Sequence, residues 1–143
     1  MHKTVNDIIA KKGRQKISVV TSYDYTMTTL CDQVDILLVG DSAGMVMLGY
    51  ENTAPVTMDQ MCMFTEAVSN GRQNALIVAD LPNKSYENEI DAVSNSERLI
   101  NAGADAVKLE GRLPDVIRAI VKAGIPVMGH LGLLPQTAKK YTV

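Results

Sequence analysis

The chain has 143 residues, 46% of them hydrophobic and 21% charged, which suits a single globular domain over residues 1–143. Its net charge of −2 and pI near 5.6 provide no basic footprint for nucleic acid or an anionic membrane, so we expect neither as a partner. No apolar run approaches the ~20 residues of a bilayer span, and the polar start MHKTVNDIIAKKG is unlike a signal peptide.

Short apolar, β-rich runs alternate with stretches of helical periodicity along the chain. The runs predict strands over residues 17–22, 36–39, 75–79, 106–109 and 126–128. The stretches between them predict helices over residues 26–33, 58–70, 88–102 and 113–123. Cys31 and Cys62 fall in two of these helices without the spacing of a metal site, so we expect reduced thiols and a cytoplasmic protein.

Each predicted helix has an apolar face that we expect to be buried. The helix 58–70 begins after Thr57, a good N-cap, and Gly71 stands just past its end, whereas Gly124 is the stop signal of the helix 113–123. The expected faces, in chain order, are Met27, Leu30 and Cys31; Met61, Phe64, Thr65 and Val68; Ile90, Val93 and Ile100; Val116, Ile117, Ile120 and Val121.

Alternation of apolar strands with helices predicts an α/β fold in which helices cover a parallel sheet. Two architectures share this pattern. One is an open, doubly wound sheet, which the number of strands suits. The other is a (β/α)₈ TIM barrel of ~250 residues, of which this chain would hold about the first five βα units.

A polar residue follows every predicted strand. Since the carboxyl ends of parallel strands share one edge, we expect these side chains to converge. A single Asp at such an end is more often the N-cap of the next helix, but several in register repel one another unless a cation lies among them. Carboxylate oxygens suit Mg²⁺, and a lysine there offers a fixed charge for an anion. The residues are Asp24, Asp41, Asp80, Lys108, Glu110 and His130.

Other readings of the same residues are weaker. The chain has neither a P-loop nor a spaced GxGxxG motif for phosphate. Ser42 lies in GDSAG, which is not the G-x-S-x-G of a hydrolase nucleophile. His130 is either a solvated side chain in the turn GHLG or a ligand or acid, and both possibilities stay open.

The strand-end segments resemble those of the ketopantoate hydroxymethyltransferase family, and the likeness extends over nearly the whole chain. The resemblance implies the (β/α)₈ barrel of the phosphoenolpyruvate/pyruvate superfamily. It is carried, in family order, by TSYDY, LLVGDSAGMVMLGY, PVTMDQM, VADLP, AGADAVKLEG and IPVMGHLGLLPQ.

The resemblance also implies an activity and its residues. The family transfers a hydroxymethyl group from 5,10-methylenetetrahydrofolate to 3-methyl-2-oxobutanoate, through a Mg²⁺-stabilised enolate, and gives 2-dehydropantoate for pantothenate biosynthesis. By resemblance Asp41 and Asp80 are metal ligands, and Glu110 is a direct or water-mediated metal contact. The 2-oxo acid contacts are, by resemblance, Asp41, Ser42, Asp80 and Lys108.

Three departures from the family pattern affect these expectations. The segment 31–36 is shortened, and Asn83-Lys84 stands where the family has an aromatic residue after DLP. The family's general-base Glu lies on a later strand, and no residue before Val143 matches it. We therefore expect a homo-oligomer or pairing with a C-terminal part. The alternatives are a catalytically incomplete half-barrel that binds metal and 2-oxo acid or serves in assembly, and a carbon–carbon lyase or mutase of the superfamily.

Overall fold

The computed structural model describes residues 2–138, so Met1 and residues 139–143 of the predicted domain lie outside the description. The predicted strands and helices are present, with each end within two residues of its expected place. Their bounds are β1 Val19–Thr21, α2 Tyr25–Cys31, β2 Ile36–Val39, α4 Met58–Gly71, β3 Leu76–Asp80, α5 Glu89–Asn101, β4 Ala106–Glu110, α6 Pro114–Lys122 and β5 Val127–His130.

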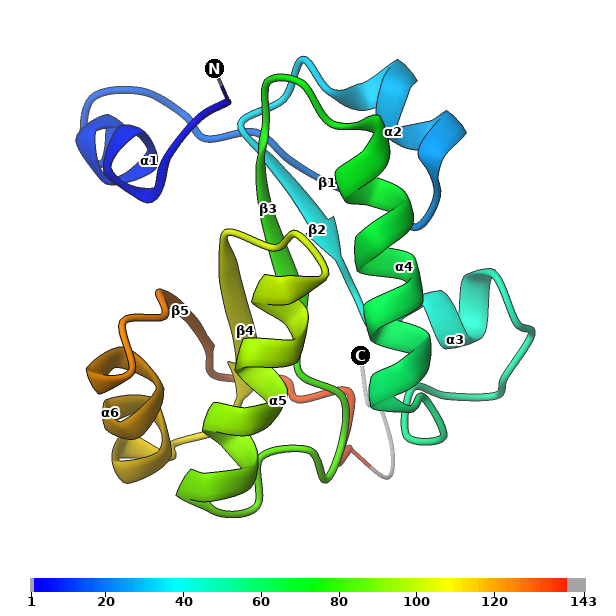
Figure 1. The fold of residues 1–143 in the computed structure, drawn as a ribbon, viewed down its shortest axis with the longest axis vertical. Helices are drawn as coiled ribbons and strands as arrows, with labels where there is room; N and C mark the ends of the chain where they lie inside the picture. The colour runs from blue at the N-terminus through cyan, green and yellow to red at the C-terminus, as the bar shows by residue number, and fades with distance from the viewer. Residues whose placement is uncertain (1, 139–143) are drawn as a thin grey trace.

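Two short helices were not predicted: α1, Val5–Lys11, and α3, Ala43–Val46. A capping box begins α1, because the Thr4 hydroxyl accepts from the Asp7 N–H and the Asp7 carboxylate accepts from the Thr4 N–H. In Figure 1, α1 lies beyond the amino ends of the strands, whereas α3 lies toward their carboxyl ends.

The strands form one parallel sheet in the order β1-β2-β3-β4-β5. An open doubly wound sheet needs a reversal of strand order, and this sheet has none. When every right-handed crossover advances in the same direction, all the connecting helices fall on one face. Figure 1 shows α4 and α5 crossing that face. The sequential order therefore excludes the doubly wound alternative and fits the wall of a (β/α)₈ barrel.

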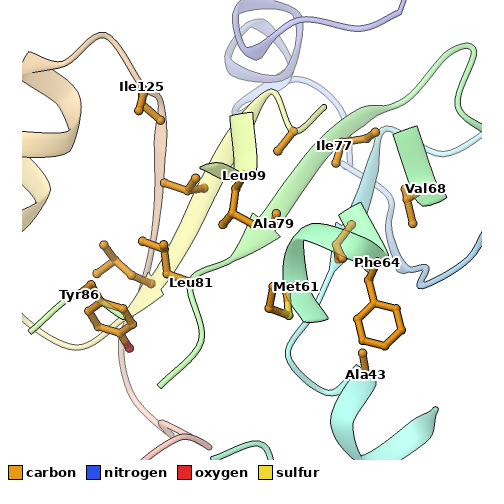
Figure 2. Packing of buried hydrophobic residues seen from close by; sticks show 14 of the residues in the cluster. Ala43, Met61, Phe64, Val68, Ile77, Ala79, Leu81, Tyr86, Leu99 and Ile125 are labelled. Atoms are coloured by element: carbon orange, nitrogen blue, oxygen red, sulfur yellow. The ribbon is translucent and has the colours of Figure 1, made fainter. Parts of the chain in front are cut away.

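The helix-covered face of the sheet holds the main core. Figure 2 shows Met61 and Phe64 of α4 beside β3, with Phe64 directed toward Ala43 of α3. These contacts confirm the expected face of α4, whose four named residues are all buried. The strand residues in this core alternate along the chain, as the two-residue period requires: Leu37, Val39, Ile77, Ala79, Val107 and Leu109.

The other face of the sheet carries a smaller apolar cluster near the amino ends of the strands. Ile36, Leu76, Val78 and Ala106 form this cluster, and the side chains of Val5 and Ile8 on α1 pack against it. Continuing the same alternation toward the carboxyl ends brings polar residues onto this face, namely Asp80, Lys108, Glu110 and His130.

The expected apolar faces of α2 and α5 are wrong in part. Helix α5 buries Ala92, Ser96 and Leu99, and leaves Ile90 81% exposed. These small residues let α5 pack closely, and the Ser96 hydroxyl is satisfied within the helix by the Ala92 carbonyl at 2.6 Å.

Helix α2 buries Thr28, whereas Met27 and Leu30 are exposed. The reason is a close approach to Gly71, where a Cβ would lie 2.8 Å from the Tyr25 carbonyl oxygen and 3.0 Å from Thr28 Cβ. Gly71 is thus the last residue of α4. The position needs glycine because α4 packs closely against α2 there, and not because the helix ends there. On α6 the face is confirmed except for Val121, which is 54% exposed.

Candidate active site

Strand register brings two pairs of ionisable side chains together at the carboxyl edge of the sheet. Asp80 of β3 lies opposite Lys108 of β4, and Lys108 Nζ is 2.8 Å from Asp80 Oδ1. Glu110 lies opposite His130 of β5, with 3.3 Å between Glu110 Oε1 and His130 Nδ1. The second contact lacks hydrogen-bond geometry, so within residues 2–138 His130 Nδ1 is a buried atom without a hydrogen-bond partner.

Asp41 joins this group from the exit of β2. Its backbone N–H donates to Asp80 Oδ2 across 3.2 Å, which ties the ends of β2 and β3 together. The side chain is buried, and burial, followed by the negative charge of Asp80, raises the pKa of Asp41 to about 6. The Asp41 carboxylate is thus held near the negative charge of Asp80 without full compensation by positive charge, as binding sites for cations commonly require.

Ser42 follows Asp41 and is the N-cap residue just before α3. Its side chain does not cap that helix, and its hydroxyl pairs instead with the Tyr23 hydroxyl at 2.8 Å. Asp24, the first of the strand-end residues, has a different role. Its Oδ1 accepts from the Met27 N–H at 2.8 Å, so Asp24 is the N-cap of α2, the plainer of the two readings of such an Asp.

Gln136, in the segment after β5, connects these strand ends and was not predicted as a site residue. Its Nε2 donates to Asp41 Oδ2 at 2.7 Å and to the Leu81 carbonyl at 2.9 Å. Its backbone N–H donates to Glu110 Oε2 at 3.1 Å. Gln136 is buried, and the Tyr86 hydroxyl donates to its Oε1. In the sequence, Gln136 stood out only as the end of the family segment GLLPQ, and no physical reason assigned it a role.

Tyr86, also missed from the sequence, stands between Gln136 and β4. Its hydroxyl accepts from the Glu110 N–H at 3.4 Å and donates to Gln136. Burial, together with the nearby carboxylates, raises the pKa of Tyr86 to about 12, so the phenol keeps its proton at neutral pH.

The charges of this cluster favour a cation. Asp41, Asp80 and Glu110 are three buried carboxylates at one edge, and Lys108 forms an ion pair with one of them. Hard oxygen donors with excess negative charge are the chemistry that Mg²⁺ prefers, so the donor set fits such an ion. As they stand, however, no three His, Cys, Asp or Glu side chains among residues 2–138 form a group that could hold a metal ion.

Two clefts open beside this cluster, and residues of the segment 134–138 line both. One, of about 430 Å³, contacts Tyr86, Glu110 and Leu134; the other, of about 630 Å³, contacts Asn52 and residues 135–138. Asn83 and Lys84 line both, so the departure from the family at these positions makes the lining by β3 polar. Lys84 has a left-handed backbone with φ of 66°, which is uncommon for a residue other than glycine.

The sequence profile of the family described as "Ketopantoate hydroxymethyltransferase" matches residues 2–143. The chain belongs to this family. Among curated relatives, the 3-methyl-2-oxobutanoate hydroxymethyltransferase of Nitrosopumilus maritimus (strain SCM1) is 68% identical over 96% of this chain and 51% of its own length. The protein of the same name from Cenarchaeum symbiosum (strain A) is 62% identical over 89% of this chain and 50% of its own length. The chain thus spans about half the length of these relatives.

Solved structures confirm the fold at low sequence identity. A phosphonopyruvate hydrolase complex with oxalate and Mg²⁺ matches with a TM-score of 0.72 at 13% identity, covering 89% of this chain and 52% of that one. A 2,3-dimethylmalate lyase of the PEP mutase/isocitrate lyase superfamily matches with a TM-score of 0.68 at 18% identity, covering 90% and 51%. The chain therefore has the fold of about half of a barrel of that superfamily.

Proposed function

We propose that this family member serves to transfer a hydroxymethyl group from 5,10-methylenetetrahydrofolate to 3-methyl-2-oxobutanoate, giving 2-dehydropantoate for pantothenate biosynthesis. Family membership and relatives that carry the transferase name support the proposal. Because the chain spans about half of those relatives, its contribution is derived from its own residues.

The observation that carries the proposal is the junction of Asp41, Asp80 and Lys108. Two adjacent buried carboxylates and one ammonium group stand at the edge where barrel enzymes of this type bind substrate. A 2-oxo acid is itself an anion, so it needs positive charge to enter this place. One lysine offers part of that charge, and a divalent cation would offer the rest.

The donor set fits Mg²⁺, which Asp41 and Asp80 would hold directly and Glu110 directly or through water. When bound, the ion supplies Lewis-acid chemistry, because it draws electron density from the keto oxygen and makes the C3 proton more acidic.

The chain's own polar groups orient the 2-oxo acid. Lys108 donates to Asp80 through Nζ, which carries three protons and so keeps others for the substrate carboxylate. Ser42 and Tyr23 share one hydrogen bond between two hydroxyls, which leaves a second proton to donate to a substrate oxygen. These donors fix which end of the acid faces the carboxylates.

A catalytically incomplete half-barrel is the second candidate. It would bind metal and 2-oxo acid, or serve in assembly, without turnover. Exposed apolar residues near the β1 edge of the sheet favour it. These residues are Val19, Tyr25, Met27 and Leu30. We propose that a further copy of the chain or a separate C-terminal part covers them.

The proposed location is the cytoplasm, supported by the free thiols of Cys31 and Cys62. Among the residues that the structure describes, no helix has the length and apolar character needed to cross a membrane.

Exchange of the C3 hydrogen of 3-methyl-2-oxobutanoate into D₂O tests the transferase against the half-barrel. The assay contains Mg²⁺, with and without tetrahydrofolate, and compares the wild type with Asp80→Ala. Exchange above background that is lost in Asp80→Ala supports the transferase. Background exchange together with calorimetric binding of Mg²⁺ and the 2-oxo acid indicates the half-barrel. Identical heats for the wild type, Asp41→Ala and Asp80→Ala would remove the site from both proposals.

A further inference from the structure

Gln136 lies outside the sheet and contacts the ends of three strands at once. Its side chain meets Asp41 after β2 and Leu81 after β3, and its backbone N–H meets Glu110 at the end of β4. It is buried, although it belongs to the irregular segment that follows β5. A long polar side chain is buried in such a place only when its hydrogen-bonding groups are satisfied.

The hydrogen bonds around Gln136 have a fixed direction. The Glu110 backbone N–H can only donate, so the Tyr86 oxygen accepts from it and turns its own proton toward Gln136 Oε1. The Gln136 amide is then held with Nε2 toward Asp41 Oδ2 and the Leu81 carbonyl, both of which can accept. Only one of the two orientations of the Gln136 amide satisfies this chain of donors and acceptors. The hydrogen bonds therefore fix which way the amide faces.

This relay ends on the carboxylate that the proposed function places against a cation. Donation to Oδ2 restrains the rotation of the Asp41 carboxylate and leaves Oδ1 for a ligand. Groups that orient metal-ligating side chains in this way commonly change metal affinity by ~10- to 100-fold when they are removed.

We propose that Tyr86 and Gln136 are positioning residues, which hold the Asp41 carboxylate in place for a divalent cation through the relay from Glu110 N–H to Tyr86 to Gln136 to Asp41. The inference rests on the proposed function for the cation. The contacts of the relay join protein atoms only, so the relay and the cation site can be tested separately.

The experiment uses the 143-residue chain and two readouts. The first is the side-chain amide ¹⁵N–¹H signals of Gln136 in the metal-free protein, and the second is the affinity for Mn²⁺ by calorimetry. Tyr86→Phe removes one hydroxyl of the relay, and Gln136→Leu keeps the size of the side chain but removes its donors. Tyr50→Phe is the matched control, because the Tyr50 hydroxyl accepts from Gln60 Nε2 at 2.9 Å and is outside the relay.

We expect Tyr86→Phe to shift the Gln136 amide signals, and Tyr86→Phe and Gln136→Leu to weaken Mn²⁺ binding about tenfold, whereas Tyr50→Phe changes neither readout. Unchanged Gln136 signals in Tyr86→Phe would overturn the relay. Shifted signals with unchanged Mn²⁺ affinity would overturn the positioning role. Absence of Mn²⁺ binding by the wild type, with the signals still shifted in Tyr86→Phe, would refute the cation site of the proposed function and with it the role of the relay.

Discussion

Lys108 lies directly opposite Asp80 in the register of β3 and β4, with 2.8 Å between Nζ and Oδ1, and both side chains are largely shielded from water. Because the second oxygen of Asp80 accepts from Asp41 N–H, this single carboxylate links β2, β3 and β4 at one edge. The pair therefore belongs both to the framework of the sheet and to the candidate site.

Replacing Lys108 by Met should destabilise the protein by about 3 kcal/mol at pH 7, because removing one partner leaves the other charge buried and uncompensated. Urea unfolding measures the change. Arg118→Met is the matched control, since Arg118 pairs with Asp115 at 2.6 Å but both side chains are about 70% exposed. An exposed pair of this kind contributes about 0.5 kcal/mol or less. Equal losses in the two variants would show that the Lys108–Asp80 pair is not shielded as described.

The pH dependence of stability should report the docking of α1. Hydrogen bonds from Lys11 and Ser18 lower the pKa of Asp35 to about 2, and Lys11 Nζ is 2.5 Å from Asp35 Oδ1. A folded-state pKa below the unfolded value near 3.8 stabilises the protein above pH 4, and this stabilisation is lost as the pH falls toward 2. Since Lys11 is partly exposed, we expect this pair to contribute about 1 kcal/mol to the free energy of unfolding.

Lys11→Met should therefore lower the free energy of unfolding by about 1 kcal/mol at pH 7 and by less at pH 3. Urea unfolding at pH 7, 5, 4 and 3 measures the difference between variant and wild type. Lys12→Met changes an exposed neighbouring residue and should leave the pH profile as it is. A loss in Lys11→Met that is the same at every pH would exclude ionisation of Asp35 as its cause.

The approach of α3 to the core predicts a steric effect at Gly44. A Cβ there would lie 2.4 Å from Val56 Cγ2 and 3.0 Å from Tyr50 Cδ2. Gly44→Ala should cost about 1–3 kcal/mol of unfolding free energy through overpacking. It should also weaken binding of the 2-oxo acid, because Ser42 directly precedes α3 as its N-cap residue.

Gly129→Ala is the control for this substitution, because a Cβ added at Gly129 would meet nothing within 4 Å. Calorimetric binding and urea unfolding should both be close to the wild type for Gly129→Ala. If Gly44→Ala is as stable as Gly129→Ala, the packing of α3 against Val56 is looser than the structure indicates.

The sequence predicts β2 and β3 most clearly, since their runs of four and five consecutive apolar residues have few alternatives to a buried parallel strand. It does not decide between the sheet and the barrel by pattern, because both contain the same elements and differ only in strand order. The prediction of the buried helix faces fails where close packing needs small residues. The exposed Ile90 of α5 and the buried Ser96 both reverse what apolar periodicity indicates.

The residues of the candidate site were also predicted only in part. Asp41, Asp80, Lys108 and Glu110 could be found because parallel strands place their carboxyl ends at one edge. Gln136 and Tyr86 could not, since their contacts with Asp41 and Glu110 join segments that are distant in sequence and belong to no periodic element. Asp24 shows the limit of the rule, because it follows a strand and yet caps a helix.

The central proposal is that Asp41, just after β2, and the carboxylates at the ends of β3 and β4, Asp80 and Glu110, share one divalent cation. Its most direct test is a Mn²⁺ titration of the ¹⁵N-labelled chain, in which bound Mn²⁺ broadens the amide signals of nearby residues. We predict that the signals of Asp41, Asp80 and Glu110 broaden together at the same Mn²⁺ concentration, and that Asp80→Ala abolishes this. Broadening of the three at different concentrations, or first at exposed carboxylates such as Asp59, would contradict a shared site.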